Sequence, residues 1–322
     1  MNKDELNIVA NCLAGERRVF HYFRHRYAFL ILERLAVDGL SVADLKRSNF
    51  ACLVSKPAVK THLAQFGEST LGPEHFGSAW SDPHLNFCIS LGIWRGKADG
   101  WCQICRSGNN LVLRLNFSRQ HMHDYNRLYQ PTRTLALNYS GHPVNRKGNI
   151  NTIRETLAWA RMDFDLETGE ALIEEIQTDW CRRAKSILRY AIWAQRRGEK
   201  MPPRTYCDAS AEDVIKYFSE VLEPYSRCWH EAVLSAAIVF IRDELGIRDI
   251  YYHTAEYGHK VKRIKYDKPP RSLYSSLPRN FGFRKTQETP AFLKNDKSFC
   301  RLYRKLRPIT SHRIEFPQAR AA

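Results

Sequence analysis

The segment ALIEEIQTDWCRRAKS, residues 171–186, concentrates side chains that could do chemistry. In an extended strand, side chains alternate between two faces, which places Glu175, Gln177 and Asp179 on one face and Glu174 on the other. A carboxylate on that face could deprotonate an amine, and its neighbours could bind a polar substrate. We assign the general base to Glu175 and substrate binding to Gln177 and Asp179, because Asp179 also suits the N-cap of the following helix. The alternative is a solvated acidic face.

Three cations, Arg182, Arg183 and Lys185, follow in the opening turn of the next predicted helix. Cations at a helix N-terminus oppose the helix dipole, so a bound phosphate would offset their placement. The pattern therefore predicts a phosphate site for a cofactor. The alternative is that the preceding acidic residues neutralise these cations as surface ion pairs.

The acidic side chains of the strand and the three cations that follow them are both positioned by a strand that runs directly into a helix. Alternation predicts a hairpin of residues 155–165 and 171–179, and an apolar stripe predicts a helix that starts at Asp179 and stops at Gly198. A capped helix from Ser210 to Leu222 comes next. The elements expected after it are a buried helix (228–246), a strand (249–256), a basic loop (259–271), a strand within 280–286 and a basic helix (294–306).

The preceding half of the chain divides into helical and extended parts. The expected elements are a basic helix over 16–37, two helices within 40–67 with a capping-box-like start at Ser41 and Asp44, antiparallel hairpins from about 85 to 118, and a loop-rich segment (121–149) with one strand at 134–139. We expect an α/β protein with a central, largely antiparallel sheet, flanking helices and a helical N-terminal region. The chain divides into four predicted segments, 1–80, 81–150, 151–293 and 294–322.

The amino-acid composition limits the class of protein and the partners that it can have. The 322 residues are 43% hydrophobic, enough for a sizeable core, and carry a net charge of +16, which attracts phosphates. The chain has no run of about 18 apolar residues, and its first residues lack the apolar core of a signal peptide. Nine cysteines, an odd number, are scattered along it. We therefore expect a cytoplasmic protein with reduced thiols and no membrane partner.

The order of these elements resembles the GNAT superfamily of N-acetyltransferases. The segments DELGIRDIYYHTAEYG and LYSSLPRNFGF are similar to the strand and the terminal Gly-Phe segment of that superfamily. EEIQTDW, with WHEAVLSAAIVFIRDELGIRDIYYHT, also resembles the Glu-Ile-Gln-Ser-Asp-Trp module of phage and mobile-element polyvalent proteins. The likeness covers residues 155–293.

This resemblance implies an acyltransferase that uses acetyl-CoA or another acyl-CoA and acts on an amine acceptor. The strand–helix junction would hold the donor's phosphates, Glu175 or His253 would be the base, and Tyr274 would protonate the departing thiolate. Glu256 would lie near the acceptor. The superfamily's phosphate loop normally contains glycines that let backbone N–H groups approach the pyrophosphate, and WCRRAKSILRYA has none. That difference favours a second hypothesis, a non-catalytic nucleic-acid-binding protein on a degenerate transferase fold.

Several cations are candidates for contacts with DNA or RNA. SKPAVKTHL resembles the recognition helix of winged-helix repressors and would present Lys56, Lys60, Thr61 and His62. The basic loop and tail helix suit phosphates rather than base edges; their candidates are Lys260, Lys262, Arg263, Lys265, Arg301 and Arg304.

One cysteine–histidine group calls for a test of metal binding. Cys102, Cys105, His121 and His123 count to four zinc ligands. Two cysteines three residues apart on a strand point to opposite faces, so we expect no metal site.

Overall fold

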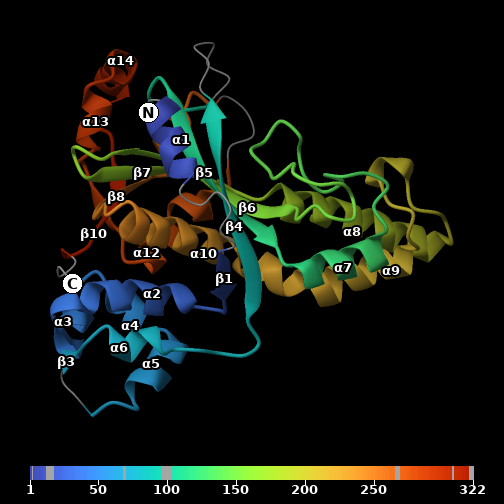
Figure 1. Ribbon diagram of the computed structural model, residues 1–322, viewed down its shortest axis with the longest axis horizontal. Helices are drawn as coiled ribbons and strands as arrows, with labels where there is room; N and C mark the ends of the chain where they lie inside the picture. Colours follow the sequence, from blue (N-terminus) through green and yellow to red (C-terminus); the bar gives the residue numbers. More distant parts are fainter. Residues whose placement is uncertain are drawn as a thin grey trace.

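The fold is mixed α/β, with one large sheet and helices packed around it (Figure 1). The computed structural model describes residues 1, 3–11, 18–67, 70–95, 103–264, 269–306 and 308–318. The expected fold class, a largely antiparallel sheet with flanking helices, is confirmed at that level.

Within the described residues the sheet has eight strands in the order β1-β4-β5-β6-β7-β8-β10-β9, of which only β7 and β8 pair in parallel. Its strands come from all four predicted segments. In that order they are β1 (Val19–Tyr22), β4 (Leu85–Arg95), β5 (Asn109–Phe117), β6 (Thr156–Asp165), β7 (Glu170–Gln177), β8 (Asp249–His253), β10 (Ser311–Glu315) and β9 (Arg284–Thr286). A separate ribbon pairs β2 (Leu40–Ser41) with β3 (Thr70–Leu71).

The predicted hairpin of β6 and β7 is present, and the hairpins expected from about 85 to 118 reduce to one, because residues 103–107 form no strand. β4 pairs antiparallel with β5, and β6 with β7. The β6–β7 turn ends at Gly169, whose φ of +66° is a conformation that glycine adopts without strain. The strand β10 was not predicted, and it lies between β8 and β9.

The helices flank this sheet. They are α1 (Lys3–Asn11), α2 (Arg26–Leu35), α3 (Val42–Arg47), α4 (Ala51–Val54), α5 (Pro57–Leu63), α6 (Glu74–Gly77), α7 (Arg119–Tyr129), α8 (Asp179–Arg197), α9 (Ala211–Lys216), α10 (Glu223–Val239), α11 (Gly258–Val261), α12 (Ser276–Asn280), α13 (Ala291–Lys294) and α14 (Lys297–Leu306). In Figure 1, α2–α6 lie together at one end of the molecule, next to β1.

Four predictions for the first half of the chain are wrong. The helix expected over 16–37 is a strand, β1, followed by α2, because VFHY pairs with β4 and His25 turns the chain with a φ of 67°. The loop expected after residue 121 begins as α7, which Ser118 caps by accepting from the His121 amide. The strand expected at 134–139 is a series of turns. Residues 40–67 form three short helices rather than two.

The chain from Ala211 to Glu244 follows one helical path. Its α-helical parts, α9 and α10, are joined by π-helical turns at Tyr217–Leu222, and further π-helical turns end it at Phe240–Glu244. Pro224 lacks an N–H and cannot continue an ordinary α-helical ladder, which explains the irregular turns before it.

The two faces of the sheet differ in chemistry. On one face, alternate residues of β5 such as Leu111, Leu113 and Leu115 belong to the main core, which α8 and α10 complete. The other face carries a small apolar cluster of Val112, Val144 and Trp159, together with most of the polar side chains described below. The candidate site therefore lies on the second face.

Strand β7 leaves its parallel neighbour halfway along. β8 pairs with Glu170–Ile173 only, whereas Glu175–Gln177 pair with β6 alone. A β-bulge between Ile173 and Glu175 leaves Glu174 without a partner residue on β6. This departure opens the edge of β7 near the start of α8.

Candidate active site

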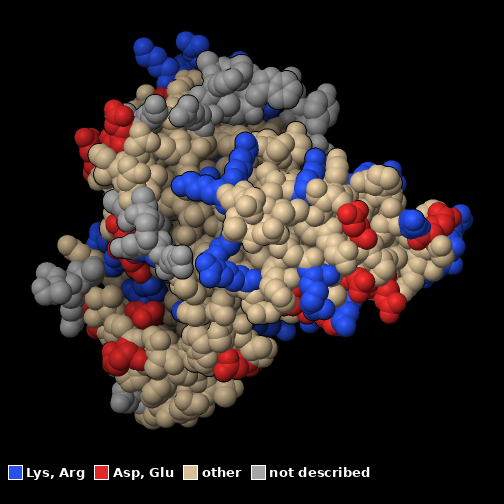
Figure 2. All heavy atoms as spheres, turned by 45° about the vertical axis from the view of Figure 1, so that its right-hand side comes forward, with Lys and Arg blue, Asp and Glu red and all other residues tan. Residues whose placement is uncertain are grey.

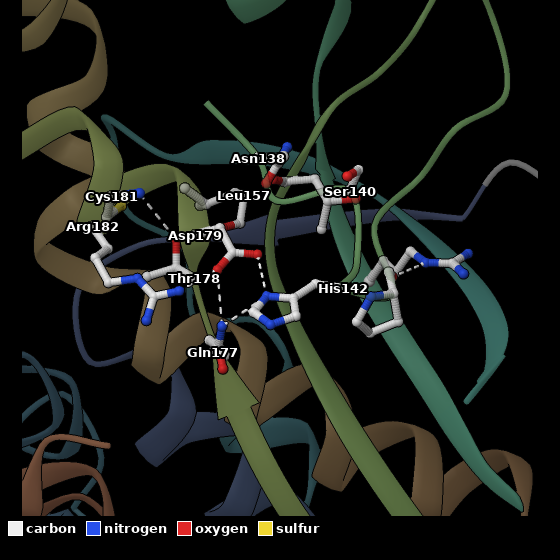
Figure 3. Close-up of polar contacts among 12 residues, drawn as sticks. Asn138, Ser140, His142, Leu157, Gln177, Thr178, Asp179, Cys181 and Arg182 are labelled. Atoms are coloured by element: carbon white, nitrogen blue, oxygen red, sulfur yellow. Dashed lines mark hydrogen bonds and ion pairs between the residues drawn. The ribbon is translucent and has the colours of Figure 1, made fainter. Parts of the chain in front are cut away.

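His142 and Asp179 form a hydrogen-bonded pair at the end of β7 (Figure 3). His142 Nδ1 lies 2.7 Å from Asp179 Oδ2. The other carboxylate oxygen accepts from Gln177 Nε2 at 2.8 Å and from the Arg182 guanidinium at 2.7 Å. Asp179 is buried, whereas 26% of the His142 side chain is exposed. The pair thus joins a fixed carboxylate to an imidazole that solvent reaches.

The electrostatics assign the roles within this pair. Burial alone would raise the pKa of Asp179, but hydrogen bonds from His142 and Gln177 and the charge of Arg182 outweigh it and lower that pKa. The Gln177 amide Nε2 also lies 3.0 Å from His142 Nδ1, but it already donates to Asp179 Oδ1. Asp179 is the charged acceptor and the shorter contact, so we place the proton of His142 on Nδ1. The lone pair of Nε2 is then available, and no described residue forms a hydrogen bond with it. A neutral imidazole oriented by a carboxylate is a suitable general base.

The loop of residues 130–155, here called the His142 loop, positions the imidazole. Glu155 is buried at its end, and its carboxylate accepts from Asn138 Nδ2 at 3.0 Å. Arg114 of β5 donates from Nε to the carbonyl of Pro143 at 2.5 Å, next to the histidine. Both halves of the loop are therefore fixed by buried or half-buried side chains, and His142 does not depend on its own contacts alone.

Asp179 is the first residue of α8, so the prediction that Asp179 is the N-cap of this helix is wrong. Thr178 is the N-cap: its hydroxyl accepts from the Cys181 amide at 3.2 Å and donates to the carbonyl of Leu157 at 2.6 Å. Thr178 fills the capping position and ties α8 to β6. The Asp179 carboxylate is free of that task and faces His142.

Glu175 belongs to a buried ionic cluster. Its carboxylate lies 2.8 Å from the Arg161 guanidinium and 3.3 Å from Lys262 Nζ. Burial would raise the pKa of Glu175, but the charges of Lys262 and Arg161 outweigh it and lower that pKa. Glu174 also approaches Arg161, at 3.7 Å, because the bulge turns both glutamates to one side. The prediction that strict alternation separates Glu174 from Glu175 is therefore wrong.

His253 lies at the end of β8, and its side chain is buried against a thiol. His253 Nε2 is 3.1 Å from Cys105 Sγ. Burial and the charges of Lys262 and Arg161 lower the pKa of His253 well below its usual value, and burial raises the pKa of Cys105 well above its own. The two groups are a neutral imidazole and a neutral thiol, not an activated nucleophile.

Tyr274 and Glu256 line a cavity of about 300 Å³ beyond the end of β8. Tyr274 is buried, burial raises its pKa well above 10, and its hydroxyl has no hydrogen-bond partner among the described residues. Glu256 is exposed at the rim and pairs with Arg271 at 3.0 Å. The cavity thus combines a protonated phenol with a surface ion pair.

The three predicted phosphate-binding cations lie together at the start of α8. Arg182 and Lys185 are exposed, and Arg183 packs over the Tyr206 ring at 5.3 Å from its centroid. Arg182 pairs with Asp179, as the alternative interpretation expected. Arg183 and Lys185 form no ion pair with an acid in the described part of the chain.

The predicted nucleic-acid contacts are spread over the molecule. Lys60 and Thr61 are exposed on α5, Lys56 is half-buried over the Tyr27 ring, and His62 packs among aromatic rings. Lys262 is only 1% exposed and belongs to the buried cluster, so it adds no charge to the surface. Lys260 and Arg263 are exposed, as are Arg301 and Arg304 on α14; Lys265 lies outside the described residues.

The cysteine–histidine group does not assemble in the described part of the chain. Cys105 faces His253, while His121 is buried with its ring stacked on Phe117. Cys102 lies outside the described residues. Among the residues that the structure describes, no group of three or more His, Cys, Asp or Glu side chains is arranged to hold a metal ion. None of the described helices has the length and apolar character needed to cross a membrane.

Gln177 and Asp179 are predicted from the sequence, whereas their main partner, His142, is not. That histidine lies 37 residues from Asp179 along the chain, in a segment treated as a plain loop. The sequence offers one local indication of His142. In SGHPVN the histidine lies between a glycine and a proline, at a turn that would present its ring to solvent.

The fold and this site define a mixed α/β protein with a carboxylate-oriented histidine at a strand–helix junction. Comparison of the chain with protein-family models, with curated proteins and with solved structures finds no match.

Proposed function

We propose that the protein is a GNAT-like acyltransferase that transfers an acyl group from coenzyme A to an amine, with His142 as the general base. The observation that carries this proposal is the position of the His142–Asp179 pair, where β7 leaves β8 and α8 begins. In the superfamily that the sequence resembles, the strand–helix junction binds the pyrophosphate of acyl-CoA. A base at that junction would act next to the donor.

The elements behind the resemblance also support this proposal. Antiparallel strands precede the β7–α8 junction, the buried helix α10 precedes β8, and the Gly-Phe segment precedes β9. Because α8 begins without glycine, the side chains of Arg182, Arg183 and Lys185 would hold the donor's phosphates in place of backbone amides.

His142 suits the role of base better than Glu175 or His253. The Glu175 carboxylate is neutralised by Arg161 and Lys262, and a carboxylate of lowered pKa is a weaker base. His253 is buried against Cys105. Of these three candidates, His142 alone combines an orienting carboxylate with exposure to solvent.

Bound acyl-CoA would supply the thioester. Nε2 of His142 would accept the proton that the amine loses as its nitrogen bonds to the acyl carbon and the carbon–sulfur bond breaks. Tyr274, kept protonated by burial, would give its proton to the departing thiolate.

Titration calorimetry with acetyl-CoA and coenzyme A tests donor binding. We expect binding by the wild type, a loss of at least about tenfold in affinity for Arg183→Glu, and little change for Arg197→Glu at the far end of the same helix. Absence of binding by the wild type would exclude acyl-CoA as the donor.

Substitution of the base tests catalysis. With acetyl-CoA and spermidine or polylysine as acceptor, His142→Gln should slow thiol release by roughly 10² to 10⁴ fold, the usual contribution of a general base. His123→Gln, which changes an exposed histidine on α7, is the matched control. Equal rates for the two variants would remove His142 from the mechanism.

A second candidate is non-catalytic nucleic-acid binding, and one observation favours it. α13 and α14 border a groove of about 270 Å³ that is lined by Lys294, Lys297, Arg301 and Arg304. Such a groove attracts a phosphate backbone without any chemistry at His142. Loss of oligonucleotide binding by Lys297→Glu/Arg301→Glu, together with no acyl-CoA binding by the wild type, would favour this candidate.

A further inference from the structure

One face of α8 carries a row of cations with a tryptophan among them. This row, here called the α8 stripe, consists of Arg182, Lys185, Arg189, Trp193 and Arg196. The spacings of three and four residues keep all five side chains on one side of the helix. The four cations are exposed, and Trp193 is 42% exposed. The opposite side, with Trp180, Ala184 and Ile187, packs into the core.

The cations of the α8 stripe form almost no ion pairs with acidic side chains in the described ranges. The only acidic residue of α8 is Asp179, which is buried and occupied by His142 and Arg182. Lys185, Arg189 and Arg196 form no ion pair within the described ranges. Like charges three or four residues apart on a helix repel, so an ordinary surface helix would alternate their sign. A bound polyanion would relieve this repulsion.

Arginines beside the α8 stripe are held in place by aromatic rings. Arg133 of the His142 loop and Arg183 of α8 both pack over Tyr206, at 3.4 and 5.3 Å from the ring centroid. Arg204 packs over Tyr190 of α8 at 4.2 Å. Stacking orders a guanidinium but leaves its N–H groups available for phosphate oxygens. Figure 2 shows lysines and arginines projecting from the central part of one face, with acidic side chains mostly nearer its edges.

We propose that the α8 stripe and its flanking arginines bind the phosphate backbone of a nucleic acid. The row from Arg182 to Arg196 spans roughly 21 Å at 1.5 Å per residue, which matches several successive phosphates of a strand and exceeds the needs of one phosphate group. A guanidinium can bind a phosphate through two N–H groups at once. The exposed Trp193, whose ring the Arg197 guanidinium approaches at 5.0 Å from the centroid, offers a stacking surface for a base.

The α8 stripe leads to the candidate active site. Its first member, Arg182, donates to Asp179, the residue that orients His142. A strand that follows the stripe therefore brings its end, or a group attached to it, to His142. This last step rests on the proposed acyltransferase function, in which Arg182, Arg183 and Lys185 hold the donor's phosphates; with the donor bound, the strand contacts Arg189, Arg196 and the flanking Arg204. The step makes the amine acceptor a nucleic acid or a molecule attached to one, and the binding surface does not depend on it.

Fluorescence anisotropy with labelled 20-nucleotide single-stranded DNA, single-stranded RNA and duplex DNA tests the surface. Arg189→Glu/Arg196→Glu should weaken binding at least tenfold for the preferred strand. The matched control is Lys46→Glu/Arg47→Glu on α3, which makes the same charge change on two exposed residues at the other end of the molecule. Neither substituted pair includes a member of the His142 site, and acetyl-CoA titration of each variant reports on donor binding separately.

The outcomes separate this inference from the proposed function. Selective loss in the α8 variant supports the surface even if acetyl-CoA does not bind, which would remove only the acyltransferase proposal. Equal losses in the α8 and α3 variants, selective loss in Lys297→Glu/Arg301→Glu alone, or no oligonucleotide binding would overturn it. Binding to phosphatidylserine vesicles without binding to any oligonucleotide would assign the stripe to a membrane surface and also overturn it.

Discussion

At the scale of single residues, the polar side chains on the second face of the sheet have two distinct tasks. Arg161 and Lys262 are almost fully buried and pair with the buried carboxylates of Glu174 and Glu175, so this cluster holds the open edge of β7 in place. His142 and Asp179 lie at the end of the same strand, where solvent reaches the imidazole. Stability and chemistry can therefore be tested by substitutions only a few residues apart.

Glu175→Gln should destabilise the fold because it leaves the charges of Arg161 and Lys262 buried without their carboxylate. We expect the free energy of unfolding to fall by about 3 to 5 kcal/mol, as when one partner of a buried ion pair is removed. Urea denaturation measures this. The control is Glu256→Gln, whose 45% exposed carboxylate pairs with Arg271 and should contribute less than about 1 kcal/mol. Equal losses of unfolding free energy in the two variants would show that the buried ion pairs of Glu175 stabilise the fold no more than the exposed pair of Glu256.

That destabilisation should depend on pH. The folded pKa of Glu175 is lowered from 4.5, so its ion pairs stabilise the protein above pH 4.5 and lose this effect as pH falls through the lower folded value. The difference in unfolding free energy between wild type and Glu175→Gln should be constant from pH 7 to about pH 5 and shrink below it. A difference that grew on acidification would mean that the folded pKa is raised instead.

The composition of the site could be predicted only in part. Gln177 and Asp179 were expected to act together because they are two residues apart on one strand. His142, Arg161 and Lys262 reach the same region from separate elements, and no local pattern joins them. Strict alternation of side chains also fails at the bulge at Glu174, because one extra residue moves a side chain to the other face of the sheet.

At the scale of elements, the β7–α8 junction connects the sheet to the site. The Thr178 hydroxyl caps α8 and also donates to the carbonyl of Leu157 on β6. It therefore fixes the direction in which Asp179 leaves the strand. A loss of this hydroxyl should affect both the helix and the His142–Asp179 pair.

Thr178→Ala should cost about 2 kcal/mol of unfolding free energy, because it removes an N-cap and leaves a buried carbonyl without its donor. Ser210→Ala, which removes the N-cap of α9 and an exposed hydrogen bond to the Asp213 carboxylate but no bond to a buried carbonyl, should cost about 1 kcal/mol. Thermal denaturation compares the two variants, and Thr178→Ser should restore most of the loss. If the two alanine variants were equally stable, the bond to Leu157 would have no structural role.

Strong local patterns predicted the elements well, and tertiary pairing explains the failures. The β4–β5 and β6–β7 hairpins, α8 with its Gly198 stop and β8 follow from period and turn residues. β1 carries a run that also fits a helix, and only its pairing with β4 makes it a strand. α7 was missed although Met122, Tyr125 and Leu128 follow helical spacing and are buried, because its polar residues resembled a loop.

At the scale of the whole molecule, strands from distant parts of the chain share one sheet. β10, near residue 313, lies between β8 and β9 and pairs with both. A five-residue strand rich in charge gives little sequence signal, and its place depends on the two strands already present. The net charge of +16 is likewise a property of the whole chain, and the α8 stripe gathers part of it in one row.

The salt dependence of binding distinguishes a row of phosphate contacts from general attraction by this charge. Each contact contributes about 0.7 to the slope of log affinity against log salt for a single strand and about 0.9 for a duplex. Arg189→Gln/Arg196→Gln should therefore reduce that slope by roughly 1.4 or 1.8, because two contacts are lost. Lys46→Gln/Arg47→Gln, with the same change in net charge, should leave the slope unchanged. Anisotropy titrations from 50 to 300 mM salt measure both slopes, and equal reductions would mean that net charge, rather than the α8 stripe, attracts the nucleic acid.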